Sequence, residues 1–311
     1  MEFEHHNLDR FIQGTPLIPT AYPLFFSHVF RIGPSGRKEF RTMTNQVGFE
    51  YLENQGESVF ETFLRYTDEK EKSSAVLAGI LRSLINRDGI SLLDVGSGNG
   101  EYLKLALNQT RSRKKIRVTL LEPSGDLVRQ LRLTATYFPD FVAAEIVNST
   151  FDDFTARSCF DIILASHLPF PRGVLPCAFR KMLDLLAPDG CLIVILREKD
   201  DVHEFRTTFK SKLMGEAYRS LTIDDAVQVF NEVTQTRPLR ILRRHADSEL
   251  RFLLADNLRD TISIIEFFLN KKWEEFPDDI RDAVLSHVNR KNGVFHQTDG
   301  FAVVWQVNPS N

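Results

Sequence analysis

The residues with the clearest chemistry are three glycines and one acid. Gly96, Gly98 and Gly100 follow the apolar run 92–95, and Glu122 ends the next apolar run. Glycine lets a backbone turn sharply and lets a ligand press against it. A helix that starts after such a turn offers free N–H groups to a carboxylate. A glutamate at the end of the neighbouring run can accept both hydroxyls of a ribose, so the pattern indicates a nucleoside-bearing ligand.

The glycine spacing narrows the kind of ligand. Dinucleotide-binding turns have the pattern Gly-x-Gly-x-x-Gly, whereas residues 96–100 read Gly-x-Gly-x-Gly, which favours a methyl donor over a dinucleotide. After the third apolar run, Ser149 and Thr150 offer small polar groups, and Phe151 offers an aromatic ring where an adenine would lie. These pieces occur in the order that one crevice at the carboxyl edge of a parallel sheet requires.

The elements that must position these residues alternate along the middle of the chain. Short apolar runs are each followed by a longer stretch with helical spacing, which predicts a parallel sheet with helices on both faces. The predicted strands are 91–95, 116–121, 141–147, 160–166 and 191–196, and the predicted helices between them are about 100–108, 124–137 and 174–186.

The two ends of the chain have a different pattern. Residues 1–46 are rich in proline and glycine and read as an irregular N-terminal arm, and 47–89 read as two helices on the substrate side. A single domain is expected over 47–307. It adds the helical substrate-side segments 197–236 and 250–292 as a lobe over the site, and its last strands are 239–245 and 301–307.

Composition excludes several other classes. The 39 basic and 42 acidic residues give no basic excess for nucleic acid, and no apolar run is long enough to span a membrane. The three cysteines form no C-x-x-C pair and no histidines have metal-ligand spacing, so neither a disulfide framework nor a metal site is expected. Without a signal-like N-terminus, we expect a cytoplasmic protein, monomeric or homodimeric.

In its cofactor half the chain resembles the class I S-adenosylmethionine methyltransferases. The resemblance rests on Asp94-Val95-Gly96-Ser97-Gly98-Asn99-Gly100 as their first motif and on Glu122 as the acid that binds ribose. It implies S-adenosylmethionine as cofactor and a Rossmann-like, mostly parallel sheet of seven strands, the last two of which form an antiparallel hairpin. The cofactor residues that it adds are Asp94 and Ser97.

A narrower resemblance is to histamine N-methyltransferase. It rests on three short stretches, 63–69, 121–124 and 293–301. It implies that Glu69 falls on the substrate-binding acid of that family and that Ser149 or Thr150, together with Ser166, falls on cofactor positions. Pro123, in the stretch 121–124, is a further cofactor residue expected from this resemblance. Gln297 stands where that family has an asparagine that contacts the substrate. We therefore expect the same architecture with a changed pocket and an acceptor other than histamine.

Methyl transfer needs alignment more than it needs many catalytic groups. A carboxylate can hold an ammonium and later accept its proton, which makes Glu69 a candidate, although it could also be a solvated acid in a charged run. His167, at the end of the fourth strand, is a candidate base or substrate contact, and Phe170, His296 and Gln297 could line the same pocket.

The sequence therefore predicts a small-molecule N-methyltransferase acting on an amine or an amino-acid derivative. O- or C-methylation of a small acid or secondary metabolite is the alternative enzyme activity. A scaffold that binds the cofactor without catalysis is the alternative from another class.

Overall fold

A computed structural model describes residues 59–306 except 169–172, 216–217, 219, 234–237 and 253–256. Before residue 59 it describes the backbone of four two-residue strands: β1 (Arg31–Ile32), β2 (Lys38–Glu39), β3 (Glu53–Asn54) and β4 (Glu57–Ser58). The rest of the predicted arm, 1–46, and the predicted pocket residue Phe170 lie outside the described residues.

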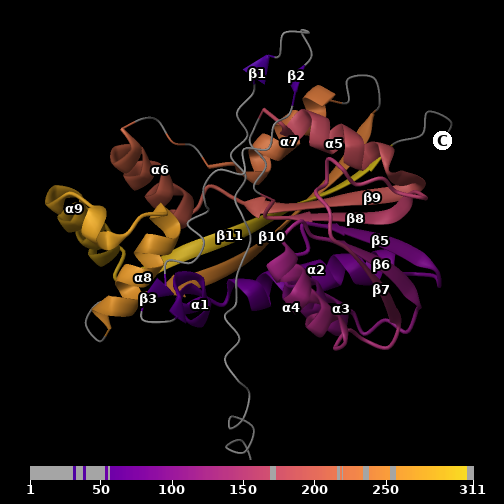
Figure 1. Cartoon of the computed structure of the whole chain (residues 1–311), viewed down its shortest axis with the longest axis horizontal. Helices are drawn as coiled ribbons and strands as arrows, with labels where there is room; N and C mark the ends of the chain where they lie inside the picture. Colours follow the sequence, from indigo (N-terminus) through magenta and orange to yellow (C-terminus); the bar gives the residue numbers. More distant parts are fainter. Residues whose placement is uncertain are drawn as a thin grey trace, which may run out of the picture.

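A seven-stranded sheet forms the centre of the molecule (Figure 1). Its order is β10 (Leu239–Arg251), β11 (Val294–Gln306), β9 (Leu186–Arg197), β8 (Phe160–Ser166), β5 (Ile90–Val95), β6 (Ile116–Leu121) and β7 (Val142–Val147). The pairs from β9 to β7 are parallel, whereas β11 runs antiparallel to both β9 and β10. The predicted Rossmann-like sheet with its closing antiparallel hairpin is confirmed.

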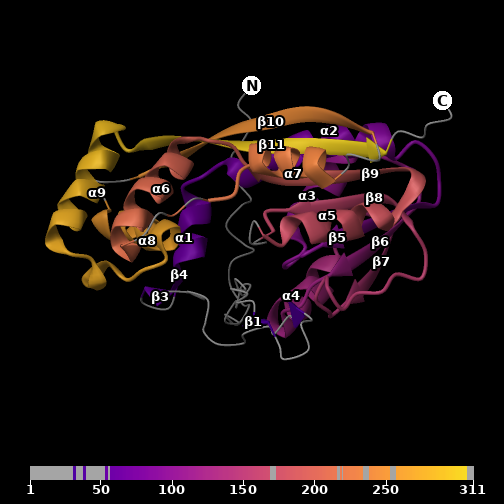
Figure 2. The ribbon, with the colours of Figure 1, turned by 90° about the horizontal axis from the view of Figure 1, so that it is seen from above.

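Helices cover both faces of this sheet, as the alternating pattern predicted. One face carries α2 (Glu69–Leu84), α3 (Glu101–Thr110) and α4 (Gly125–Ala135), and the other carries α5 (Leu175–Asp184) and α7 (Ile223–Val233) (Figures 1 and 2). Each face has its own apolar core, because the strands bury side chains on both sides. The carboxyl edge of the parallel strands therefore lies between two packed layers.

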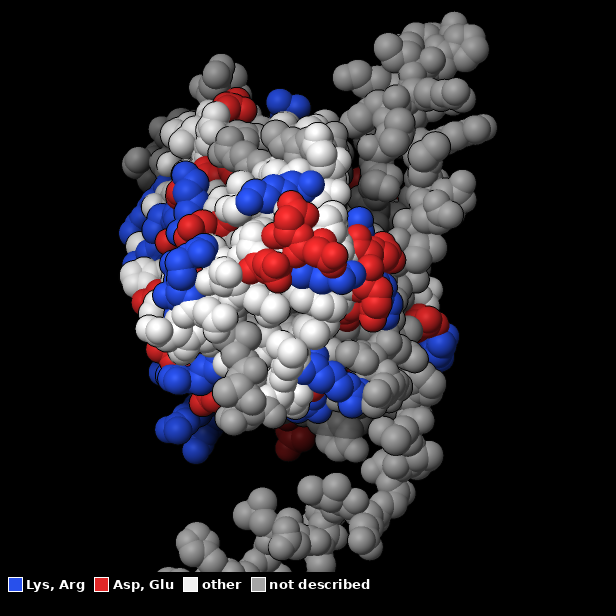
Figure 3. Space-filling view, turned by 90° about the vertical axis from the view of Figure 1, so that its left-hand side faces the viewer, with Lys and Arg blue, Asp and Glu red and all other residues white. Residues whose placement is uncertain are grey.

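A helical lobe lies beyond the sheet, at the far end of β10 and β11 (Figure 2). It contains α1 (Val59–Arg65), α6 (Asp201–Met214), α8 (Leu258–Leu269), η1 (Trp273–Glu275) and α9 (Asp278–Arg290). Phenylalanines dominate its core, including Phe205, Phe268 and Phe295, all of which are buried. Acidic and basic side chains lie side by side on the outer face of the lobe, so neither charge covers it (Figure 3).

The last two strands are longer than the sequence predicted. Both β10 and β11 have 13 residues and pair along their whole length, from Leu239 with Gln306 to Arg251 with Val294. The predicted strands, 239–245 and 301–307, cover only about half of this hairpin. The buried positions of the missed half include polar side chains such as Ser248 and Gln297, which weaken the apolar alternation. Among the described residues no helix is long and apolar enough to cross a membrane.

Candidate active site

The glycine turn after β5 has the backbone conformation that glycine favours. The φ angles of Gly96, Gly98 and Gly100 are +70°, +58° and +78°, in the left-handed region. The N–H of Gly96 donates to the carbonyl of Leu121 at 2.8 Å, which ties the turn to the end of β6. A Cβ on Gly96 would lie 2.4 Å from Cδ2 of Leu168, whereas a Cβ on Gly98 would meet nothing within 4 Å. Gly98 therefore leaves open space against which a ligand could press.

Glu122 braces this turn from the end of β6. Its side chain is buried, and its two oxygens accept the N–H groups of Gly98 and Ser124, each at 2.9 Å. Burial raises the pKa of Glu122, and the two N–H donors oppose that rise. Each carboxylate oxygen has a second lone pair, which is the capacity that the predicted ribose contact requires.

The loops after β6 and β7 are joined by a residue that the sequence did not single out. Nδ2 of Asn148 donates to the carbonyls of Glu122 and Pro123, both at 2.9 Å. The next two predicted cofactor residues bond locally: Ser149 Oγ donates to the carbonyl of Thr150, whose own hydroxyl donates to Asp153. These short polar contacts shape the rim of the turn.

The remaining predicted cofactor residues lie deeper. Phe151 is buried and packs in the core on the α5 face. Nζ of Lys181 lies over the Phe151 ring, 4.8 Å from its centre. Asp94 is buried near the end of β5, where burial raises its pKa to about 7, and its carbonyl accepts from Ser97 Oγ at 2.9 Å. Ser166 ends β8 and is half-buried. The structure thus places these residues around the end of the parallel strands.

A second group of polar side chains converges from four separate segments of the chain. One oxygen or nitrogen from each of Glu69 (α2), His167 (after β8) and Asp299 (β11) lies within 4.8 Å of the others. Arg197, at the end of β9, donates to Glu69 at 2.7 Å and to Asp200 at 3.0 Å. We call Glu69, His167, Arg197 and Asp299 the polar cluster.

Glu69 reaches this place because the start of α2 is attached to β10. Thr67 forms an isolated antiparallel bridge with Leu250, and the Asp68 carboxylate accepts the N–H of Glu249 at 2.8 Å. The Thr67 hydroxyl then accepts the N–H of Glu69 at 3.1 Å. The acid that opens α2 therefore faces the sheet, and its side chain is only 16% exposed.

The two acids of the polar cluster titrate in opposite directions. Burial raises the pKa of Glu69, which Arg197 opposes and Asp299 reinforces. Burial would also raise the pKa of Asp299, but His167 and Arg197 outweigh it and bring this pKa down to about 2. Divergent carboxyl pKa values in one crevice are typical of acid and base assignments in active sites.

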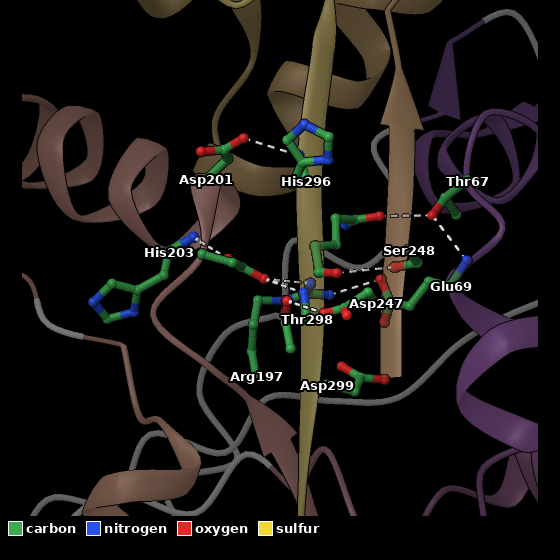
Figure 4. A network of polar contacts seen from close by, with 12 residues as sticks. Thr67, Glu69, Arg197, Asp201, His203, Asp247, Ser248, His296, Thr298 and Asp299 are labelled. Carbon is green, nitrogen blue, oxygen red and sulfur yellow. Dashed lines mark hydrogen bonds and ion pairs between the residues drawn. The ribbon is translucent and has the colours of Figure 1, made fainter. Parts of the chain in front are cut away.

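Gln297 and His296 are neighbours in β11 but lie on opposite faces of the strand. The Gln297 side chain is fully buried and accepts the hydroxyl of Thr67 at 2.6 Å, while its Nε2 has no partner among the described residues. The His296 imidazole is 75% exposed, with Nδ1 4.0 Å from Oε1 of Glu249, and the backbone N–H of His296 donates to Asp201 (Figure 4). The structure brings Gln297 to the polar cluster but not His296.

The glycine turn and the polar cluster are adjacent. Val95 of β5 pairs with Ala165 of β8, so the residues that follow these two strands leave the sheet side by side. The close approach of Leu168 to Gly96 gives a direct contact between the two segments. A ligand bound at the glycine turn would therefore lie beside the polar cluster. Helices α2 and α3 are also joined, because the hydroxyl groups of Ser73 and Tyr102 are hydrogen-bonded at 2.8 Å.

Asp299 and Arg197 belong to this site although the sequence analysis missed them. Arg197 directly follows the predicted strand 191–196, so the rule that sites collect at carboxyl ends of strands could have found it. Asp299 lies two residues after Gln297 and therefore on the same face of β11. That signal was hidden because the strand was predicted to begin at residue 301.

The charges of the polar cluster suit a proton or an ammonium better than a divalent metal ion. Arg197 already lies against Glu69, and a guanidinium next to a divalent ion would be strongly repelled. The second oxygen of Glu69, Oε1, has no hydrogen-bond partner among the described residues. One carboxylate acceptor is therefore available to a monovalent donor.

No family model matches this sequence, and no curated protein matches it. Several solved structures share parts of its arrangement. The YcgJ protein from Bacillus subtilis has a TM-score of 0.47 and 12% identity, over 75% of this chain and 99% of that one. A cyclopropane synthase from Mycobacterium tuberculosis has a TM-score of 0.45 and 13% identity, over 75% and 85%.

A plantazolicin methyltransferase, BpumL, solved in complex with a triazolic desmethylPZN analog and SAH, has a TM-score of 0.42 and 14% identity, over 78% of this chain and 88% of that one. With identities of 12–14% and TM-scores below 0.5, these likenesses say nothing by themselves about what this chain binds.

Proposed function

We propose that this protein is an enzyme that transfers a methyl group from S-adenosylmethionine to a nitrogen of a small amine or amino-acid derivative. The fold, the open glycine turn and Glu122 support the cofactor. The resemblance to class I methyltransferases points the same way. The similarity to histamine N-methyltransferase remains a prediction, and histamine is not the acceptor that we propose.

The observation that carries this proposal is the position of Glu69. A carboxylate oxygen of Glu69, from a helix near the N-terminal end of the described residues, lies within 4.8 Å of side-chain atoms of His167 and Asp299. One of its oxygens pairs with Arg197 and the other has no partner among the described residues. A solvated acid on a helix surface would have no reason to make these contacts, since long charged side chains prefer water.

The residues of the chain have separate tasks in this reaction. When bound, S-adenosylmethionine supplies a methyl group on a sulfonium, which a nucleophile can displace directly. Glu69 would hold the ammonium form of the acceptor through its available oxygen, and Gln297 would offer its unpartnered N–H group to an acceptor atom of the same molecule. His167 would receive or share a proton. The buried face of β11 that carries Gln297 and Asp299 would exclude water from the acceptor.

Calorimetric titration with S-adenosylmethionine, followed by methylation assays on small amines, amino-acid derivatives and carboxylic acids, tests the proposal. We expect saturable binding and turnover on an amine. Glu69→Gln should leave cofactor affinity unchanged and lower kcat/KM for the amine by about 100-fold, because the acceptor ammonium loses its carboxylate partner and removing one partner of a buried charge pair costs about 2–5 kcal/mol. Glu71→Gln is the matched control, because Glu71 lies on the exposed face of the same helical turn.

Each failure points to a different conclusion. Binding without turnover on any acceptor would indicate a scaffold that binds the cofactor. Turnover on acids or hydroxyl compounds that Glu69→Gln does not affect would indicate O- or C-methylation. An absence of cofactor binding would overturn the proposal altogether.

A further inference from the structure

We propose that Asp299 and His167 form a dyad that removes the proton from the acceptor, with Asp299 as the positioning residue and Nδ1 of His167 as the proton acceptor. This inference rests on the proposed function and assigns the step that Glu69 alone leaves open.

The geometry of the pair supports the dyad. Nε2 of His167 lies 3.3 Å from Oδ2 of Asp299, whose side chain is only 1% exposed. An acid that contacts Nε2 fixes the tautomer with the proton on Nε2 and leaves Nδ1 as the basic nitrogen. Among the described residues Nδ1 makes no hydrogen bond. The ring is 40% exposed, which gives a transferred proton a way out to solvent.

The backbone of His167 is held in an unusual conformation that favours this placement. Its φ angle is +49°, in the left-handed region that few residues other than glycine adopt. Its N–H donates to the carbonyl of Ile195 at 2.8 Å, which fixes the turn after β8. Such strain persists where the surrounding structure imposes it, and it is concentrated at functional sites.

Charged groups from three elements face His167, and together they favour its protonated form. Partial burial opposes protonation, but Asp299 on β11 and Glu69 on α2 outweigh it and raise the pKa of His167, while Arg197 on β9 opposes them. Asp299 itself stays ionised at neutral pH because its pKa is about 2. The buried acid thus makes the imidazole a stronger base than an isolated histidine.

The atoms balance without any further reagent. The acceptor ammonium gives one N–H proton to Nδ1, which frees its lone pair. The nitrogen then forms a bond to the methyl carbon while the carbon–sulfur bond breaks, and that electron pair stays on the sulfur. His167 passes its extra proton to solvent before the next cycle, and Asp299 stays ionised throughout.

The test combines NMR titration of the His167 ring with pH profiles of kcat/KM for one amine substrate. The resonance is assigned as the one lost in His167→Gln. In Asp299→Asn we expect the titration midpoint of His167 to move to lower pH. The acidic limb of the rate profile should move in the same direction, and kcat should fall by about 100-fold. Cofactor affinity, measured by calorimetry, should not change.

Asp247→Asn is the matched control, because Asp247 lies on the neighbouring strand with a side chain that is 73% exposed. It should leave both the His167 titration and the rate profile unchanged. An unmoved His167 midpoint in Asp299→Asn, or a moved midpoint with an unmoved rate profile, would overturn the dyad. If Asp299→Asn does not fold, a His167 midpoint below 6.5 in the wild type overturns it. The NMR titrations of His167 need no substrate. They can therefore overturn the dyad even if the proposed methyl transfer is correct, and support it even if no acceptor is found.

Discussion

The glycine turn and the polar cluster lie side by side, yet they are built in different ways. The turn is local: residues 96–100 follow one strand, and Glu122 ends the next, so short segments of sequence create it. The polar cluster is assembled from α2, β8, β9 and β11, which are separated by up to 230 positions, from Glu69 to Asp299. The first kind of site depends on backbone conformation, and the second depends on long-range charge pairing.

The largest effect should come from removing the arginine of the polar cluster. Arg197→Met would leave Glu69 and Asp200 without their cation in a site where these side chains are 16% and 4% exposed. Breaking a buried ion pair from one side costs about 3–5 kcal/mol, so we expect the free energy of unfolding in urea to fall by about 3 kcal/mol.

Arg243→Met is the control for this effect. Arg243 pairs with Glu198 at 3.3 Å, but both side chains are 36% exposed, and such pairs contribute about 0–1 kcal/mol. Equal losses in the two variants would contradict the view that the polar cluster depends on buried charge pairing.

A smaller effect is expected in the glycine turn. Gly96→Ala puts an alanine at a φ of +70° and its Cβ 2.4 Å from Leu168. The left-handed strain and the crowding together should lower the free energy of unfolding by about 2 kcal/mol. We also expect cofactor affinity to fall at least tenfold in a calorimetric titration. Gly98→Ala shares the positive φ but has open space, so its loss of stability should be about 1 kcal/mol.

The control for glycine removal lies outside the site. Gly79 is in the middle of α2, where an added Cβ would meet nothing within 4 Å, so Gly79→Ala should stabilise the protein by about 0.5–1 kcal/mol. Thermal unfolding with and without cofactor would separate the three variants. If Gly96→Ala behaved like Gly79→Ala, the turn would not depend on backbone conformation.

The smallest effect concerns the edge of the polar cluster. Thr67→Val removes the hydroxyl that donates to Gln297 at 2.6 Å and accepts from the N–H of Glu69. An unsatisfied buried acceptor costs about 1 kcal/mol or more, so unfolding in urea should show a loss of about 1 kcal/mol. Thr136→Val, which removes an exposed hydroxyl, should change stability by less than about 0.5 kcal/mol. Equal effects would mean that Gln297 does not depend on Thr67.

The sequence by itself determined the sheet and the glycine turn. Apolar runs of strand length alternate with helical spacing, and these signals act within ten or twenty residues. The strands 116–121 and 160–166 were predicted with the bounds that the structure has. A sharp turn at the three glycines was also predicted, and their φ angles lie in the left-handed region that glycine favours. At these positions, residue type and spacing within a short segment were enough to predict the structure.

Only the tertiary structure decided the polar cluster. In the sequence, nothing distinguishes Asp299 from a surface acid, because only the structure shows that β11 begins at Val294 and includes it. In the same way, Arg197 could be a surface charge at the start of a loop, and only the structure shows its pairing with Glu69. His296 and Gln297 were predicted to lie together, but the two-residue period of a strand separates them onto opposite faces. The pairing of charges across α2, β9 and β11 depends on long-range packing, which no local pattern encodes.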